Sequence, residues 1–364
     1  MVTTSVRTDV ALNTIALRRK IGPVAVMDLT GTRWPEPLRW SPTTGCAAFD
    51  LARQRADVMV TVGKAETGPS DSTNAGFFGL TATNLLAGWL HAAALTDRPM
   101  GDVLLWALDE RLDEPIRLLR DHPRAAPGVA AMLDNIYRSP AETRSNMWTT
   151  VMTAVAPLLS EVARQAFSPP RGQGFNIDAF LRDRGTAYLI VPEYQAGDLA
   201  PIVSAFVEEI TQAAARHAAV APTGRLDPPL GLLLDEVANV VPLPRLPQLM
   251  SFAGGTGIFT AAVLQDIAQA RQRWGREGAD MIWGAATVKI ALGGLGGDEL
   301  TEFSRLAGQY RESLTTSQFG SHGITMQTTL QDRPAISRSM FAPSPKSAVK
   351  PWCFTPRRHR SSPG

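Results

Sequence analysis

The 364-residue sequence contains no Gly-x4-Gly-Lys-Ser/Thr motif, the glycine-rich loop whose backbone amides and lysine bind nucleotide phosphates in many ATPases. Its one Gly-Lys pair, Gly63-Lys64, is followed by Ala65, and Val58 stands where the first glycine of the motif belongs. The sequence therefore excludes an ordinary phosphate loop at any position that it covers.

Cysteine is scarce as well. Cys46 and Cys353 lie far apart in the sequence and match no metal-ligand spacing, so we expect a reducing compartment. No apolar run reaches the roughly 18–20 residues that span a bilayer, and Met1–Ser5 does not begin a secretory signal. We therefore expect a cytoplasmic chain, with any membrane attachment supplied by a partner or by sequence absent here.

Neither sign of charge dominates, because 36 Lys/Arg oppose 34 Asp/Glu. Seven of the basic residues and none of the acidic ones lie in residues 333–364, so residues 1–332 carry a small acidic excess. Net charge thus gives no case for nucleic-acid binding by the whole chain, although a local basic lining such as Arg18–Lys20 remains open. The five histidines are scattered without the spacing of metal ligands, which gives no indication of a metal or nucleophile site.

The most informative feature that is present is the apolar run Leu232–Leu234 followed by Asp235 and Glu236. Such a run is typical of a buried parallel strand, and it would place both acids at the carboxyl end, where open α/β sheets hold their ligands. In phosphoryl transfer one carboxylate holds magnesium and a neighbouring one orients the attacking water. A strand that simply ends at a solvated acidic loop is the alternative.

Helical and strand-like patterns alternate along much of the chain. Strand-like runs at 24–28, 186–191, 232–234, 258–264 and 286–292 are separated by helical patterns, which predicts a mostly parallel sheet with helices on both faces. Residues 74–167 look entirely helical, and Trp89, Trp106 and Trp148 within them are predicted to be core residues rather than base-stacking platforms.

These patterns predict four parts. The first and third are the two portions of an α/β core, the second is an all-α insertion, and the last is a disordered, basic, Ser/Pro/Arg-rich tail. Their predicted ranges are 1–65, 66–175, 176–320 and 321–364.

A second polar residue follows the next strand along the chain. Gln265 comes directly after the run that ends at Leu264, where a polar side chain senses the terminal phosphate in RecA-like motors. A turn residue before the helix cap Asp266 is the alternative. Two glycine-rich segments, 253–257 and 293–297, lack a following Lys-Ser/Thr and are predicted to be a structural turn and a flexible link.

Taken in order, these motifs resemble the type IV secretion coupling proteins of the TraG/TraD class, and most of all its actinobacterial members. The specific matches are Leu232–Asn239, Leu246–Leu249, Gly257-Ile258, Leu264-Gln265, Ala268-Gln269 and Trp274-Gly275. Looser matches are Gly22–Val26, Leu90–Leu95, Glu142–Arg144 and Ala286–Ile290, so that the resemblance covers roughly residues 5–310.

The resemblance implies a hexameric RecA-like P-loop NTPase core with an all-α insertion, at the cytoplasmic face of a membrane channel. Such a protein uses ATP and Mg²⁺ to drive single-stranded DNA and its relaxase through a conjugative secretion system. By position, Asp235 matches the magnesium-associated acid, Glu236 the catalytic base and Gln265 the sensor.

Departures from the family pattern lead to further expectations. Family members carry transmembrane helices and a phosphate loop upstream, so we interpret this chain as an N-terminally truncated form that lacks the phosphate-loop strand. We expect negligible ATP hydrolysis by the chain alone, and exposed apolar surface with unpaired strand edges. The alternatives are a non-catalytic DNA- or relaxase-binding module that assembles with full-length paralogues, and a gene fragment without function.

Overall fold

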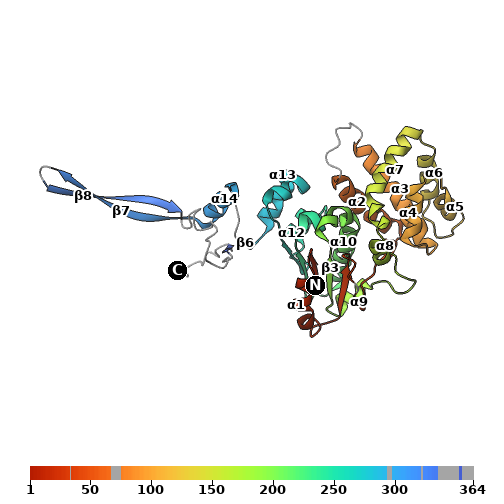
Figure 1. The fold of residues 1–364 in the computed structure, drawn as a ribbon, viewed down its shortest axis with the longest axis horizontal. Helices are drawn as coiled ribbons and strands as arrows, with labels where there is room; N and C mark the ends of the chain where they lie inside the picture. Colours follow the sequence, from red (N-terminus) through yellow and green to blue (C-terminus); the bar gives the residue numbers. More distant parts are fainter. Residues whose placement is uncertain (33, 67–74, 293–296, 321–322, 335–351, 355–364) are drawn as a thin grey trace. The chain divides into compact units, whose positions relative to one another are not determined.

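The computed structural model describes the whole chain except residues 33, 67–74, 293–296, 321–322, 335–351 and 355–364. It divides into two compact units, Met1–Ile282 and Trp283–Gly364, each of which is described by itself (Figure 1). The glycine-rich link predicted at 293–297 falls almost entirely outside the described residues.

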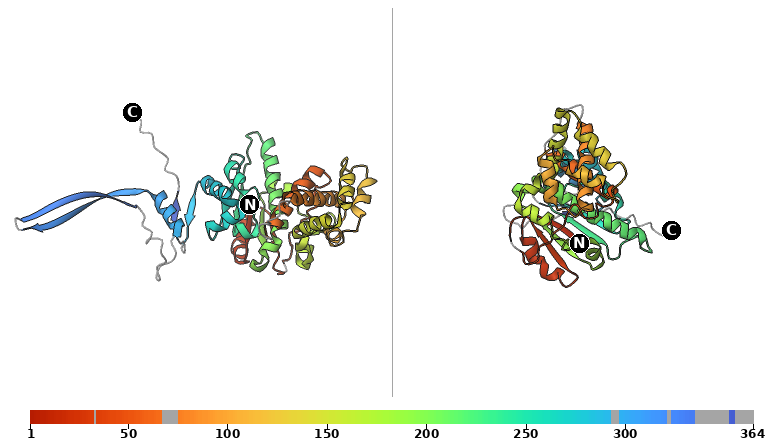
Figure 2. Two further views of the ribbon diagram at one scale, coloured as in Figure 1. Left: turned by 90° about the horizontal axis from the view of Figure 1, so that it is seen from above. Right: turned by 90° about the vertical axis from the view of Figure 1, so that its right-hand side faces the viewer.

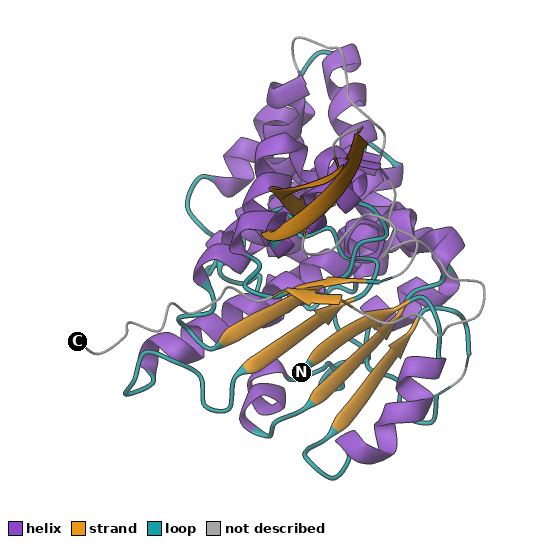
Figure 3. Ribbon diagram, turned by 90° about the vertical axis from the view of Figure 1, so that its left-hand side faces the viewer, coloured by secondary structure: helices purple, strands orange, loops and turns teal. Residues whose placement is uncertain are grey.

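The first unit is built on a five-stranded sheet with the strand order β2-β3-β1-β4-β5. All four pairs of neighbouring strands are parallel, which confirms the predicted α/β class (Figure 3). The strands are β1 (Val2–Ser5), β2 (Val24–Asp28), β3 (Thr186–Ile190), β4 (Leu230–Leu234) and β5 (Ile258–Ala262).

Strand β1 lies at the centre of this sheet, although no strand is predicted there from the sequence. Val2 pairs with Ala187 of β3 on one side and with Leu232 of β4 on the other. All four residues of β1 are buried, even though three of them are Thr or Ser. Four residues with one apolar side chain show no periodicity, so the burial of β1 comes from its neighbours rather than from its own composition.

Helices cover the two faces of the sheet unequally. Helix α1 (Asp9–Arg18) packs on one face, where Ala11 joins Tyr188 and Ile190 in a small cluster. We call this side the α1 face. On the other side, α10 (Ala196–Val220) packs in the main core with Leu232 and Leu234, and we call it the α10 face. The elements between β4 and β5 are α11 (Val237–Val240) and α12 (Leu246–Phe252), and α13 (Ile267–Ala285) follows β5.

Between β2 and β3 the chain forms the predicted helical segment, which lies to one side of the sheet (Figure 2). Trp89, Trp106 and Trp148 are buried there, as predicted. The boundaries predicted for this segment at 66 and 175 remain predictions. Its elements are α2 (Phe49–Glu66), α3 (Ala75–Leu95), α4 (Met100–Leu108), α5 (Glu114–Arg120), α6 (Val129–Tyr137), α7 (Ala141–Val155), η1 (Ala156–Leu159), α8 (Glu161–Phe167) and α9 (Ile177–Arg182).

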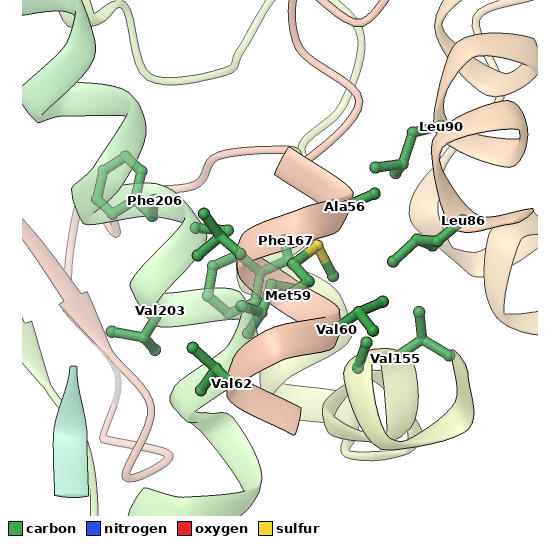
Figure 4. Close-up of a cluster of buried hydrophobic side chains, with 14 of the residues drawn as sticks. Ala56, Met59, Val60, Val62, Leu86, Leu90, Val155, Phe167, Val203 and Phe206 are labelled. Atoms are coloured by element: carbon green, nitrogen blue, oxygen red, sulfur yellow. The ribbon is translucent and has the colours of Figure 1, made fainter. Parts of the chain in front are cut away.

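Helix α2 connects the helical segment to the α/β core. Figure 4 shows Val62 on the side of α2 towards Val203 of α10, while Val60 lies towards Leu86 of α3. These side chains are all buried in one continuous cluster. The two parts of the unit therefore share a core.

Gly63, excluded above as a phosphate-loop residue, has a packing role instead. A Cβ atom at Gly63 would lie 2.8 Å from the backbone oxygen of Thr153, so glycine allows α2 and α7 to approach closely. We expect Gly63→Ala to lower the free energy of unfolding by about 1–3 kcal/mol, because this contact is with backbone that has to move. Urea denaturation followed by circular dichroism measures the change.

Gly101 in α4 provides the matched control, since a Cβ at that position meets nothing within 4 Å. Gly101→Ala is expected to be neutral or slightly stabilising, because alanine loses less backbone entropy than glycine in a helix. Equal effects of the two substitutions would contradict a packing role for Gly63.

The second unit corrects two expectations. Strand β6 (Lys289–Ala291) does not continue the parallel series but pairs antiparallel with β9 (Trp352–Phe354). Strands β7 (Gln309–Gly320) and β8 (Gly323–Pro334) form an antiparallel hairpin preceded by α14 (Gly297–Ala307). Thus β8 and β9 lie within the range 321–364 predicted as disordered, and the rest of that range is outside the described residues. Composition carries no information on strand pairing: β8 pairs with β7, which directly precedes it, and β9 pairs with the distant β6.

No helix in the described part of the chain combines the length and the apolar character that crossing a bilayer requires.

Candidate functional site

The predicted acids lie at the carboxyl end of β4, directly after Leu234. The Asp235 carbonyl accepts a hydrogen bond of 2.9 Å from the Thr4 hydroxyl of β1, and the Val237 amide donates to the Val263 carbonyl after β5 at 3.2 Å. Hydrogen bonds from β1 and to the residue after β5 therefore fix the backbone that follows β4.

Glu236 has a backbone conformation that few residues of its type adopt. Its φ of 50° and ψ of 42° lie in the left-handed region, which costs free energy for a residue with a Cβ. Strain of this kind persists only where surrounding contacts fix it, and the bonds around Asp235 and Val237 provide them. The sharp turn directs the Glu236 side chain towards the end of β5.

The side chains of Gln265 and Glu236 meet at the carboxyl ends of β5 and β4. Its side-chain amide nitrogen donates a 2.6 Å hydrogen bond to one Glu236 carboxylate oxygen, and Asn239 donates to the other at 3.3 Å. Gln265 also exchanges longer hydrogen bonds with Gln269. The structure thus brings together the three residues singled out from sequence, while the roles assigned to them remain predictions.

The electrostatic environment of Asp235 favours a cation. Burial raises the pKa of its carboxyl group, and the charges of Glu236 and of Asp9 raise it further, against a backbone hydrogen bond that lowers it. A divalent cation beside these carboxylates would relieve both the repulsion and the desolvation. The donor set therefore suits Mg²⁺, although no three His, Cys, Asp or Glu side chains within the described residues are grouped to hold a metal without other ligands.

Asp9 is the site residue that sequence reasoning missed. It lies in the first turn of α1, directly after β1, and its charge reaches Asp235 because β1 and β4 are neighbours. Predicting Val2–Ser5 as a strand would have pointed to Asp9, since the carboxyl end of β1 lies beside that of β4, where the acids are.

Other residues singled out from sequence lie at the opposite end of the strands, where β3 and β5 begin. Arg18 ends α1 and donates a 2.8 Å hydrogen bond to Thr186, the first residue of β3. The basic run Arg18–Lys20 is therefore not beside the acids. Gly257, at φ 83°, closes the turn before β5, where a Cβ would lie 2.8 Å from the Leu226 carbonyl. The prediction of 253–257 as a structural turn is confirmed.

Helix α13 is hydrogen-bonded to residues 238–243, which follow the acids. Arg273 donates a 3.0 Å hydrogen bond to the Ala238 carbonyl, and Trp274 donates one of 2.8 Å to the Leu243 carbonyl. A groove of about 380 Å³ lies alongside, between α2, the 242–248 segment and α13. None of the three site residues lines that groove, so it is separate from the acid site.

Comparison with known proteins gives a consistent assignment. Residues 229–343 match the family model described as the TraM recognition site of TraD and TraG. No curated protein gives a significant match. Among solved structures, the unbound monoclinic form of the bacterial conjugative coupling protein TrwBdeltaN70 has a TM-score of 0.64 at 16% identity, and the likeness covers 98% of this chain and 82% of that one.

Two nucleotide complexes of the plasmid coupling protein TrwB are also similar. The complex with the non-hydrolysable ATP analogue ADPNP has a TM-score of 0.63 at 16% identity, and the complex with ADP and Mg²⁺ has 0.61 at 14%. Each likeness covers 98% of this chain and 82% of the other. At such identity these structures show a shared fold, and with the match over 229–343 they confirm the resemblance to the TraG/TraD coupling proteins.

Proposed function

We propose that this chain is a coupling protein of a conjugative type IV secretion system, with the ATPase-type core that drives transfer of single-stranded DNA and relaxase. The observation that carries the proposal is the hydrogen bond between Gln265 and Glu236 at the carboxyl ends of β5 and β4. The family match over 229–343 supports the same conclusion and adds a TraM-like accessory protein to the expected partners.

Each site residue has a defined role in this proposal. Asp235 would hold Mg²⁺, which neutralises phosphate charge when a nucleotide is bound. Glu236 accepts a proton from the attacking water and orients it. Gln265 holds the Glu236 carboxylate in place and links it to β5. A conformational change at Glu236 would therefore be transmitted to β5. Homo-hexamer assembly and attachment to membrane channel components belong to the same proposal.

We expect the 364-residue chain alone to hydrolyse ATP negligibly. A nucleotide polyanion needs the backbone amides and lysine of a phosphate loop, and this sequence contains no such motif. Phosphate release by the purified chain with ATP and Mg²⁺ should match that of the Glu236→Gln variant. Glu161→Gln, in α8 far along the sequence from the site, is the matched control for a change of one carboxylate.

Hydrolysis by the wild-type chain that Glu236→Gln abolishes and Glu161→Gln preserves would contradict this expectation. It would show that another part of the chain binds the phosphates.

The second candidate function is a non-catalytic module that binds DNA or relaxase and assembles with full-length paralogues. The absence of the phosphate-loop motif from the sequence favours it. Equilibrium binding separates the two candidates: Mg²⁺-dependent ATP binding that Asp235→Asn abolishes supports the ATPase core. Binding of single-stranded DNA or relaxase that is indifferent to ATP and to Asp235→Asn supports the module. Binding of none of these ligands would contradict both candidate functions.

A further inference from the structure

One side chain of the central strand β1 reaches the turn that carries the acids. The paired register of β1 and β4 ends at Thr4 and Leu234. The carbonyl of the next residue, Asp235, accepts a hydrogen bond of 2.9 Å from the Thr4 hydroxyl. This bond therefore lies just beyond the last paired residues, where the chain turns out of the sheet.

Thr4 lies in the interior of the protein. It is only 1% exposed, and it comes two residues after Val2 of the main core, which places both side chains on the α10 face. Valine has nearly the same shape as threonine and would fill this position without a polar atom. A buried hydroxyl lowers stability unless it is hydrogen-bonded. The bond to the Asp235 carbonyl is therefore what a threonine contributes at this position.

The Asp235 carbonyl belongs to the peptide group that joins Asp235 to Glu236, and this group is hydrogen-bonded at both ends. Its oxygen accepts from the Thr4 hydroxyl, and its N–H donates to the Asp235 carboxyl group. Hydrogen bonds joined in this way polarise one another. One peptide group thus connects a buried hydroxyl of β1 to the carboxylate that follows β4.

Backbone strain at Glu236 makes the orientation of this peptide group depend on its hydrogen bonds. The φ of Glu236 is 50°, and rotating the peptide group by half a turn would make φ negative, as a residue with a Cβ prefers. The same rotation would turn the carbonyl oxygen from Thr4 towards the Asp235 carboxylate, which repels it. The Thr4 bond therefore opposes a rotation that relief of strain favours.

We propose that Thr4 is a positioning residue for the acid site: through the 235–236 peptide group, its hydroxyl fixes the orientation of the Asp235 carboxylate. The effect on the backbone rests only on the hydrogen bonds of the turn, whereas the effect on metal binding rests on the proposed function. Replacing a residue that orients a metal ligand typically lowers metal affinity about 10–100-fold.

Variants of the full chain at two neighbouring threonines test the role of the hydroxyl. Thr4→Val removes it and keeps the shape, and Thr4→Ser keeps it. Thr3→Val is the control in the same strand, because the Thr3 hydroxyl, on the α1 face, makes no hydrogen bond to any described residue. The readout is the NMR signal of the Glu236 amide, which its bond to a carboxylate shifts downfield. Selective glutamate labelling and the loss of the signal in Glu236→Gln identify it.

We expect the Glu236 amide signal to move upfield in Thr4→Val and to stay in place in Thr4→Ser and Thr3→Val. All variants are first checked for wild-type circular dichroism. An unchanged signal in Thr4→Val, or the same change in Thr3→Val, would overturn the positioning role. A Thr4→Ser variant that behaves like Thr4→Val would also overturn it, because packing and not the hydroxyl would then decide the orientation.

Mn²⁺, a paramagnetic ion that takes the same oxygen ligands as Mg²⁺, separates this inference from the proposed function. If Asp235 holds the metal, Mn²⁺ broadens the Glu236 amide signal in the wild type and not in Asp235→Asn. Thr4→Val should then need about tenfold more Mn²⁺ for the same broadening, and Thr3→Val no more than the wild type. No broadening in the wild type would contradict the metal role of Asp235, while an upfield shift in Thr4→Val would still support the role of Thr4.

Discussion

Arg55→Met is expected to destabilise the first unit by about 3–5 kcal/mol, the cost typical of leaving one partner of a buried ion pair alone. The Arg55 side chain is 2% exposed and pairs with Glu209 of α10, which is 11% exposed. Its guanidinium also donates to the Pro42 carbonyl at 2.7 Å and lies 5.0 Å from the Trp40 ring centroid. One side chain thus joins α2, α10 and the loop that precedes α2. Urea denaturation followed by tryptophan fluorescence measures the loss.

The double variant Arg55→Met/Glu209→Met tests whether the ion pair carries this effect. Replacing both charges with apolar groups of similar size is often nearly neutral, so we expect the double variant to be more stable than Arg55→Met. Arg216, which also contacts Glu209 at 2.9 Å, is more than half exposed and should compensate little. Additive losses from the two substitutions would show that packing, and not charge pairing, accounts for the effect.

Cys46 offers an independent measure of the same loss. Burial raises the pKa of its thiol to about 11, so the folded chain should react slowly with alkylating reagents. Arg55 contacts this sulfur at 3.2 Å. Faster labelling of the Cys46 peptide in Arg55→Met, detected by mass spectrometry, would report opening of the α2–α10 contact.

His91→Leu should cost about 2–4 kcal/mol, because it leaves two backbone groups without a partner at about 1–3 kcal/mol each. His91 is fully buried in α3. Its Nδ1 lies 2.9 Å from the Cys46 carbonyl oxygen, and its Nε2 lies 3.0 Å from the Ala126 nitrogen. The amide can only donate, so Nε2 accepts and the proton is on Nδ1. The neutral ring therefore connects three segments, and thermal unfolding at pH 7.5 measures its contribution.

The same contacts predict a pH dependence. Burial lowers the pKa of His91, and the nearby His122 lowers it further, against a raising effect of the Cys46 hydrogen bond. Below the unfolded value of about 6.5, the unfolded chain binds a proton that the folded chain does not. Stability from His91 is thus fully present above that pH and is lost as the pH falls towards its lowered pKa. Wild type should lose more stability than His91→Leu between pH 7.5 and pH 5, and parallel losses would contradict the assignment.

Local sequence patterns predicted where Asp235, Glu236 and Gln265 lie, because these residues follow apolar strands, while their roles remain predictions. The run Leu232–Leu234 is buried in the core except for Leu233, and the polar residues after β4 and β5 meet as parallel strand ends require. The sequence could not predict how β6 pairs, since its antiparallel partner β9 lies some sixty residues further along. It also missed α2, whose buried side chains face two different helices and so show no single apolar stripe.

The central position of β1 has a consequence for how the protein is made. Val2 pairs with Ala187 and with Leu232, so β1 leaves the ribosome well before both of its neighbouring strands. At roughly 5–20 residues per second, that delay is on the order of 10–50 s. During this time the helices of residues 49–182 can pack against one another, whereas β1 has no partner strand. The nascent chain should therefore acquire its helical segment before its sheet, and it should depend on chaperones until β4 has been translated.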